Sequence, residues 1–199
     1  MERYCQLTSC WAGEMMKIEY PEIGICGLSC RLCPNYHIEG ESRCGECKSD
    51  GRMKVGCTFI TCAVKRKGIE FCWQCTEQEG CQRWRQHREW GKHHDSFTCY
   101  QRLEDNIEFL KGQGVDAFVE DQQARERLLM AMLAEFNEGR SKTYYSIAAT
   151  IMDLEELEEA IALGRKRSTG MDIKAKARAL HAVLDAIARK SGYHLKLRK

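Results

Sequence analysis

Cys26-Gly-Leu-Ser-Cys30-Arg-Leu-Cys33 is the stretch that decides how this chain folds, because it opens a run of closely spaced cysteines. Ten of the 13 cysteines lie between residues 26 and 81, and the last 100 residues contain none. Cysteines separated by two residues are typical of metal-binding turns, in which two thiolates hold one ion. We therefore expect a metal-binding module. Its candidate ligands are Cys26, Cys30, Cys33, Cys44, Cys47, Cys57, Cys62, Cys72, Cys75 and Cys81.

Two further pairs have the two-residue spacing: Cys44-Gly-Glu-Cys47 and Cys72-Trp-Gln-Cys75. Backbone N–H groups face the sulfur atoms in such turns, and Gly45, directly after the first cysteine of its pair, is expected to ease that geometry. A tetrahedral Zn²⁺ ion takes four Cys or His ligands, so ten thiols suffice for two zinc ions with two thiols to spare. The spacing leaves open which thiols share an ion.

An iron–sulfur cluster is the main alternative cofactor. The spacing of Cys26, Cys30 and Cys33 matches that of radical S-adenosylmethionine enzymes, and Pro34 follows as in the Cys-Pro of ferredoxins. Leu32 stands where the radical enzymes carry an aromatic residue, and the rest of the chain lacks their alternating strand and helix patterns. The sequence therefore favours zinc and leaves a cluster protein in electron transfer or redox chemistry as the alternative.

Other uses of the cysteines fit less well. A disulfide framework goes with secretion and an even count, whereas this count is odd and the N-terminus lacks a signal-peptide pattern. Cys72-Trp-Gln-Cys75 could act as a redox dithiol, but no thioredoxin-like pattern surrounds it. No stretch approaches the roughly 18 apolar residues of a membrane helix. We expect a cytoplasmic protein without a membrane partner, whose natural start lies at Met15 or Met16 rather than Met1.

The sequence predicts an α+β, mainly α fold, in which a small irregular cysteine-rich module precedes a helical domain. We expect a peripheral segment at 1–20, the module at 21–99, and the helical domain with a basic tail at 100–199. Brief helices are expected near 60–67 and 78–90. Apolar residues at helical spacing predict the further helices. These begin at Leu103, Phe118, Ser141 (as a cap), Asp153 (with Glu156 as a capping box) and Asp172, and the last ends at Gly192.

Charge is unevenly distributed along the chain. Residues 101–163 carry 6 Lys and Arg against 14 Asp and Glu, whereas residues 164–199 carry 11 against 2. These two segments would attract one another if they packed together, or the basic tail could bind an acidic partner. The formal net charge is only +2, so a general affinity for nucleic acid is weakly supported.

Residues 83–90, Arg-Trp-Arg-Gln-His-Arg-Glu-Trp, alternate cations with aromatic side chains, as surfaces that bind single-stranded nucleic acid do. The simpler interpretation is an amphipathic helix with Trp84, His87 and Trp90 partly packed. His87 could pair with Cys81 on a metal, and His93-His94-Asp95 could bind metal or act as an acid or base. Because thiols are already in surplus, we expect exposed histidines instead.

No motif for nucleotide hydrolysis, hydride transfer or serine hydrolysis occurs. We therefore expect a non-enzymatic interaction or regulatory protein, with an unidentified protein as partner and with structural metal.

The run IGICGLSCRLCPNY, followed by CGECKS and GCTFITCAVKRKGIEFCWQC, resembles a prokaryotic cysteine-rich family, domain of unknown function thirty-seven ninety-five. The similarity is strongest over residues 22–100. AEFNEGRSKTYYSIAAT and the final LKLRK resemble the long form of that family. The resemblance implies a cytosolic, zinc-binding protein without an assigned reaction, and Cys5 and Cys10 lie outside its pattern.

Overall fold

The computed structural model describes residues 16–55 and 57–199, and this part of the chain is mainly helical, as the sequence predicts. Its β pairing is one antiparallel bridge between Ile23 and Ser29, so the strand component of the expected α+β class is reduced to that bridge. The expected start at Met15, with Cys5 and Cys10, falls largely outside the described residues.

The cysteine-rich segment is built from turns and very short helices. A 3₁₀ turn and two short α-helices come first, followed by a π-helix that continues α2 and a second 3₁₀ turn. They are η1 (Cys30–Leu32), α1 (Asp50–Val55), α2 (Thr58–Ile60), η2 (Thr61–Arg66) and η3 (Cys72–Gln74). The small apolar cluster around η2 consists of Ile25, Ile60, Ala63 and Val64.

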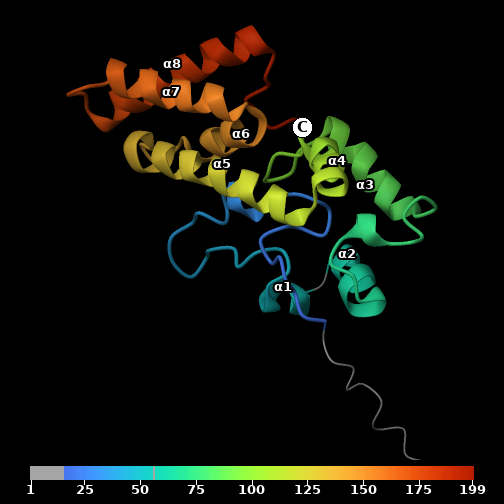
Figure 1. The fold of residues 1–199 in the computed structure, drawn as a ribbon. Helices are drawn as coiled ribbons and strands as arrows, with labels where there is room; N and C mark the ends of the chain where they lie inside the picture. Colours follow the sequence, from blue (N-terminus) through green and yellow to red (C-terminus); the bar gives the residue numbers. More distant parts are fainter. Residues whose placement is uncertain (1–15, 56) are drawn as a thin grey trace, which may run out of the picture.

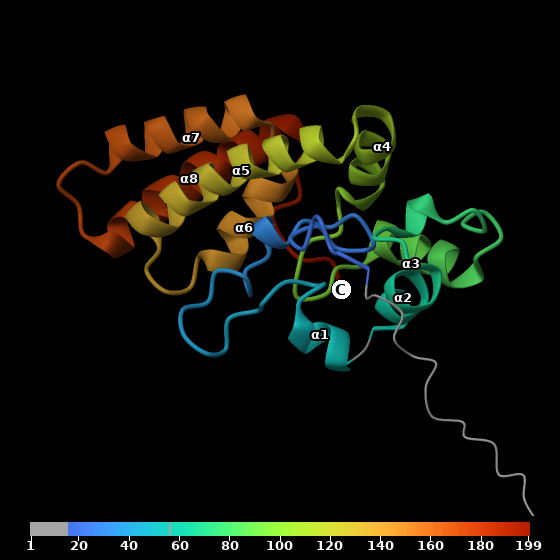
Figure 2. The same ribbon diagram turned by 60° about the horizontal axis from the view of Figure 1, so that its bottom comes forward.

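The rest of the chain forms longer helices (Figure 1). They are α3 (Gln82–His93), α4 (Leu103–Gln113), α5 (Val115–Phe136), α6 (Lys142–Ile151), α7 (Leu154–Arg167) and α8 (Ile173–Ser191). The helices expected near 60–67 and 78–90 correspond to α2 with η2 and to α3, which begins four residues later than predicted. Figure 2 shows α5, α7 and α8 lying side by side, with α6 beneath them.

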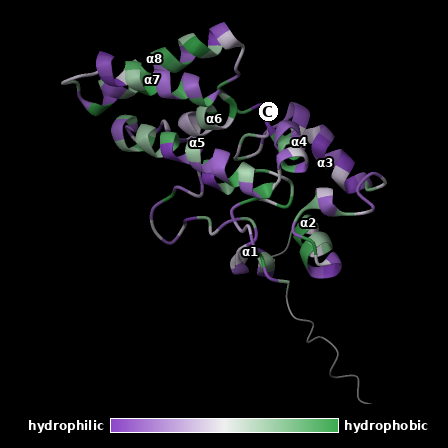
Figure 3. Cartoon of the chain, in the orientation of Figure 1, coloured by the Kyte–Doolittle hydropathy of each residue, from purple (hydrophilic) through white to green (hydrophobic). Residues whose placement is uncertain are grey.

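The main core lies between α5, α6, α7 and α8, where Leu129, Tyr145, Leu157 and Leu180 are fully buried. Gly164 lets α7 and α8 approach closely, because a Cβ atom there would lie 3.0 Å from the Cδ1 atom of Leu180. Hydrophobic and hydrophilic residues alternate along these helices, as in amphipathic helices (Figure 3). The core is thus the one that helical periodicity predicts.

The helix ends agree with the sequence in part. Asp172 caps α8 by accepting a hydrogen bond from the Ala175 N–H at 2.8 Å, and Gly192 ends it in the left-handed conformation. Ser141 and Asp153 stand at the N-cap positions of α6 and α7, but neither side chain caps its helix. The capping bonds expected there were wrong: the Ser141 hydroxyl lies 2.7 Å from Glu138 and 2.8 Å from the ring of His181 instead.

The cysteine-rich segment packs directly on the helices. η1 contacts α5 and α6, and Leu32 belongs to their core. The Arg31 guanidinium lies 2.6 Å from the Glu126 carboxylate of α5, and Lys142 donates to the His37 carbonyl at 2.9 Å. A second apolar cluster joins Trp73 and its neighbours to α4. These contacts fix the cysteines relative to the helical core.

The basic C-terminal segment returns to the α3–α4 connection. The Asp95 N–H donates to the Arg198 carbonyl at 2.9 Å, and the Arg198 side chain pairs with the Asp95 carboxylate. Between the acidic and the basic segment, Arg165 of α7 donates to Glu135 of α5 at 2.8 Å. At this position, the expected attraction between the acidic and the basic segment takes the form of an ion pair within the protein.

None of the helices in the described residues combines the length and hydropathy that crossing a bilayer requires.

Candidate metal centre

The first cysteine turn is built around Gly27. The Gly24 N–H donates to the Leu28 carbonyl at 2.8 Å, and the Gly27 N–H donates to the Gly24 carbonyl at 2.9 Å. Gly27 has a φ of +93°, and a Cβ atom there would lie 3.2 Å from Cγ1 of Ile107 in α4. The glycine after Cys26 is thus required both by its backbone conformation and by the close approach of α4.

Cys30, Cys33, Cys44 and Cys47 form what we call the first thiol group. The Cys44 N–H donates to the Asn35 carbonyl at 3.0 Å, which sets the second cysteine pair beside the first. The neighbouring Cys47 thiol raises the pKa of Cys30, and the charge of Cys44 contributes to the raised pKa of Cys33. Two turns of identical spacing therefore lie close together.

Backbone donors in this group point at sulfur. Burial raises the pKa of Cys33, while the N–H groups of Asn35 and Tyr36 and the side chain of Thr98 donate to its sulfur and oppose that rise. The hydrogen bond from Cys30 lowers the pKa of Cys47. Such donors stabilise a thiolate, which is the form that binds metal.

The second turn of the group differs from the prediction. Gly45 was expected to supply the unusual backbone conformation, but the residue at positive φ is Glu46, at 79°. Of the non-glycine residues the structure describes, Glu46 is the one with a positive φ. A left-handed conformation is costly for a residue with a side chain, so the Cys44–Cys47 turn is held in place by its surroundings.

The second thiol group surrounds Cys72. Burial and the charges of four neighbouring thiols raise the pKa of Cys72 to about 12; these neighbours are Cys26, Cys81, Cys62 and Cys75. Successive turns connect the group, because the Cys75 N–H donates to the Cys72 carbonyl at 3.2 Å and the Cys81 N–H donates to the Gln78 carbonyl at 3.3 Å.

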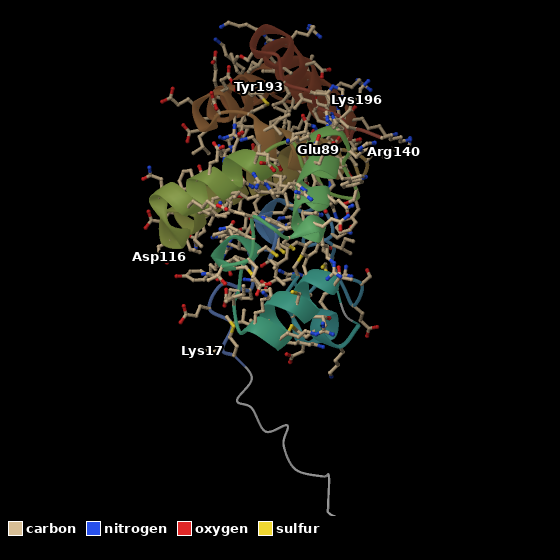
Figure 4. The ribbon with its side chains drawn as sticks, turned by 90° about the vertical axis from the view of Figure 1, so that its right-hand side faces the viewer. Lys17, Glu89, Asp116, Arg140, Tyr193 and Lys196 are labelled. Carbon is tan, nitrogen blue, oxygen red and sulfur yellow. The ribbon has the colours of Figure 1, made fainter. Side chains whose placement is uncertain are left out.

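Cys26 lies between the two groups. Burial raises its pKa to about 12, the Leu28 N–H opposes this, and the charges of Cys47 and Cys57 add to it. A Cβ atom built on Gly24 would lie 3.5 Å from the Cys26 sulfur and 3.8 Å from the Cys47 sulfur, which confirms their proximity. Cys57 is exposed. All ten predicted ligands therefore lie in one region, whose sulfur atoms gather in the blue and teal part of Figure 4.

A buried ion pair links the two segments that carry these groups, since Lys48 follows Cys47 and Glu70 precedes Cys72 by two residues. The Nζ atom of Lys48 lies 2.8 Å from Oε2 of Glu70, 3.0 Å from the Tyr20 carbonyl and 3.9 Å from the centre of the Phe71 ring. Burial lowers the pKa of Lys48, and Glu70 opposes the shift. This ion pair was not predicted from the sequence, although Lys48 directly follows Cys47.

The histidine predictions differ in outcome. His87 of α3 packs against Phe59, Trp84 and Tyr100, and its Nε2 atom is buried without a hydrogen-bond partner among the described residues. His93 is exposed, as expected. Trp84 is buried rather than available for stacking on a base, so the aromatic surface of residues 83–90 is reduced to Trp90.

The residues fit a metal by their chemistry. Ten cysteine thiols form a donor set suited to Zn²⁺ or to an iron–sulfur cluster. Within residues 16–55 and 57–199, no three Cys, His, Asp or Glu side chains stand together in a geometry that would hold an ion. Binding would therefore require the thiols of a group to rotate toward one another.

No protein-family model matches this chain, and comparisons with curated proteins and with solved structures found no significant similarity. The resemblance to the cysteine-rich family stays a prediction, and function has to be argued from the site itself.

Proposed function

We propose that this protein is a metal-binding module in which two zinc ions stabilise the cysteine-rich segment. The observation that carries the proposal is the meeting of Cys30 and Cys33 with Cys44 and Cys47, alongside a second set of thiols around Cys72. Each group offers at least four sulfur ligands, which is the number that a structural zinc site uses.

The metal would act on folding rather than on a substrate. Four thiolates fill the coordination sphere of Zn²⁺ and leave no position for water or substrate. The segment around η2 has only four fully buried apolar residues of its own, so the free energy of metal binding would supply much of its stability. Lys48 would offset part of the negative charge of the thiolates, because its ammonium group interacts with Cys30.

The cellular role that follows is a cytoplasmic interaction or regulatory module without enzymatic activity. The cysteine-rich segment and the helical core share contacts through Leu32 and Arg31, so a metal-dependent change in one would reach the surface of the other. The partner would be another protein.

An iron–sulfur protein is the second candidate. The spacing of Cys26, Cys30 and Cys33 favours it, and zinc can replace iron lost in air. The residues around the thiolates are the same for zinc and for an iron–sulfur cluster. Elemental analysis of the protein therefore has to distinguish the two.

The test is elemental analysis and absorption spectroscopy on protein purified without oxygen. We expect about two zinc ions per chain, at four ligands per ion, with no visible band. Cys33→Ser and Cys72→Ser should each lose about one ion. Cys99→Ala is the matched control, because Cys99 is buried but belongs to neither thiol group, and it should keep both ions.

Three results would contradict the proposal in different ways. Wild-type protein without metal overturns metal binding. Iron with acid-labile sulfide and a visible band replaces zinc by the second candidate. Retention of both zinc ions by Cys33→Ser and Cys72→Ser shows that the two groups are not the sites.

A further inference from the structure

A cavity of about 150 Å³ lies where the cysteine-rich segment meets the helical core, next to the first cysteine turn. Its walls come from the first cysteine turn, from the loop before α4, and from α4, α5 and α6. Leu28, Leu32, Phe109 and Phe118 form an apolar side. Its volume is below the roughly 300 Å³ of a drug-sized pocket and matches a cavity that accepts a molecule about the size of benzene.

Arg125 brings a buried guanidinium group to this cavity. The residue is 7% exposed. Its Nε atom donates to Asp121 at 2.9 Å, and Nη1 donates to the carbonyls of Ala149 at 3.1 Å and Met152 at 2.7 Å. These hydrogen bonds hold the guanidinium group of Arg125 rigidly. None of them involves its Nη2 atom. The charge of Arg125 is compensated by Asp121, and Nη2 remains available as a donor.

A second pair of opposite charges lines the other side. The Nε atom of Arg102 lies 3.0 Å from Oδ2 of Asp105, so the terminal nitrogens of Arg102 and the Oδ1 atom of Asp105 are outside that contact. With Arg125 and Asp121, the cavity presents two cations and two anions. Each cation is paired with an anion, and each pair leaves donor or acceptor atoms unused, so a ligand with both a carboxylate and an ammonium group could bind both kinds of atom.

Ser29 adds a polar group without a partner. It lines the cavity, is 9% exposed, and its hydroxyl makes no hydrogen bond to the described residues. Buried hydroxyl groups normally have a hydrogen-bond partner, so the Ser29 hydroxyl is available to a bound molecule. Ser29 lies between Cys26 and Cys30, so anything bound here touches the first cysteine turn.

We propose that this cavity binds a small zwitterion, an α-amino acid with a short apolar side chain. The ligand carboxylate would bind the guanidinium groups of Arg125 and Arg102, and its ammonium group would bind the carboxylates of Asp121 and Asp105. The apolar side chain would pack against the leucines and phenylalanines of the opposite wall. Balanced charge, small volume and one apolar wall together select this class of molecule.

The test is calorimetric and NMR titration of the full-length, metal-analysed protein with the natural amino acids. Valine is compared with 3-methylbutanoate, which lacks the ammonium group, and with isobutylamine, which lacks the carboxylate. We expect one or a few small apolar amino acids to bind, and both single-charge analogues to bind at least tenfold more weakly. The metal content of the same sample is measured as well. Failure to bind an amino acid can therefore be told apart from failure to bind metal.

Variants at the rim of the cavity locate the site. Asp105→Asn and Arg102→Gln alter partly exposed residues and should fold normally while weakening binding about tenfold. Lys174→Ala is the control, because Lys174 lies on α8, outside the cavity, and binding should be unchanged. The proposal is overturned if no amino acid binds at millimolar concentration, if the analogues bind as well as valine, or if the rim variants bind normally.

Discussion

The ammonium group of Lys48 lies 2.8 Å from Oε2 of Glu70, and both side chains are almost completely buried. Glu70 also accepts hydrogen bonds from the backbone N–H groups of Glu19 and Tyr20. One ion pair thus joins the start of the described chain, the Cys44–Cys47 turn and the segment that leads to Cys72. The pair adds a buried polar contact to segments that also pack through Tyr20 and Phe71.

Removing only one member of this pair should be more damaging than removing both. Lys48→Met leaves the Glu70 carboxylate buried without its cation, which should lower the free energy of unfolding by about 3–5 kcal/mol. The double variant Lys48→Met with Glu70→Gln removes both charges and should recover most of that loss. Urea denaturation of the three proteins measures this, and a single variant as stable as the double would contradict it.

Gly27 should tolerate no side chain. Gly27→Ala places a Cβ atom 3.2 Å from Cγ1 of Ile107 and forces alanine to a φ of +93°, so we expect a loss of about 1–3 kcal/mol. Gly112 of α4 is the matched control, because a Cβ atom there meets nothing within 4 Å. Gly112→Ala should be neutral or stabilising by up to about 1 kcal/mol. Equal effects of the two substitutions in thermal unfolding would refute this account.

The contact between Asp95 and Arg198 should make stability depend on pH. Burial alone would raise the pKa of Asp95, but the hydrogen bonds from Arg198 and from the Tyr100 N–H outweigh it and lower that pKa. A carboxylate with a lowered pKa stabilises the fold above its unfolded pKa of about 3.9, and this contribution is lost as the pH falls through the folded pKa.

Asp95→Asn should therefore be less stable than wild type by about 2 kcal/mol at pH 7. This difference in the free energy of unfolding should shrink as the pH falls below about 4. Unfolding of both proteins at matched pH values measures this difference. A constant difference between pH 7 and pH 3 would show that the carboxylate charge of Asp95 contributes nothing.

Removal of metal should affect the two parts of the chain differently, if the proposed zinc sites exist. The α5–α8 core contains Leu129, Tyr145, Leu157 and Leu180, all fully buried without any contribution from cysteine ligands. A strong chelator should therefore increase amide exchange in residues 16–81 and leave α5–α8 protected. Hydrogen exchange resolved by residue tests this, and uniform loss of protection would show that the two parts unfold together.

The positions of most helices and of the cysteine-rich region could be predicted from the sequence. Apolar residues at helical spacing mark α4, α5 and α8 because a helix in a small core must bury one face, and that requirement is local. Asp172 and Gly192 bound α8 for an equally local reason, since each satisfies backbone groups within one turn. The cysteine pairs are visible because their two-residue spacing can be read directly from the chain.

Contacts between residues that are distant in the sequence became visible only in the folded chain. Spacing along the chain does not show that Cys44 lies beside Cys33, that Lys48 pairs with Glu70, or that Arg125 and Ser29 line one cavity. Those contacts join residues from different turns and helices, and their energies depend on burial and on three-dimensional packing rather than on local sequence. The caps expected of Ser141 and Asp153 failed for the same reason, because Ser141 found partners in Glu138 and His181, the latter 40 residues away.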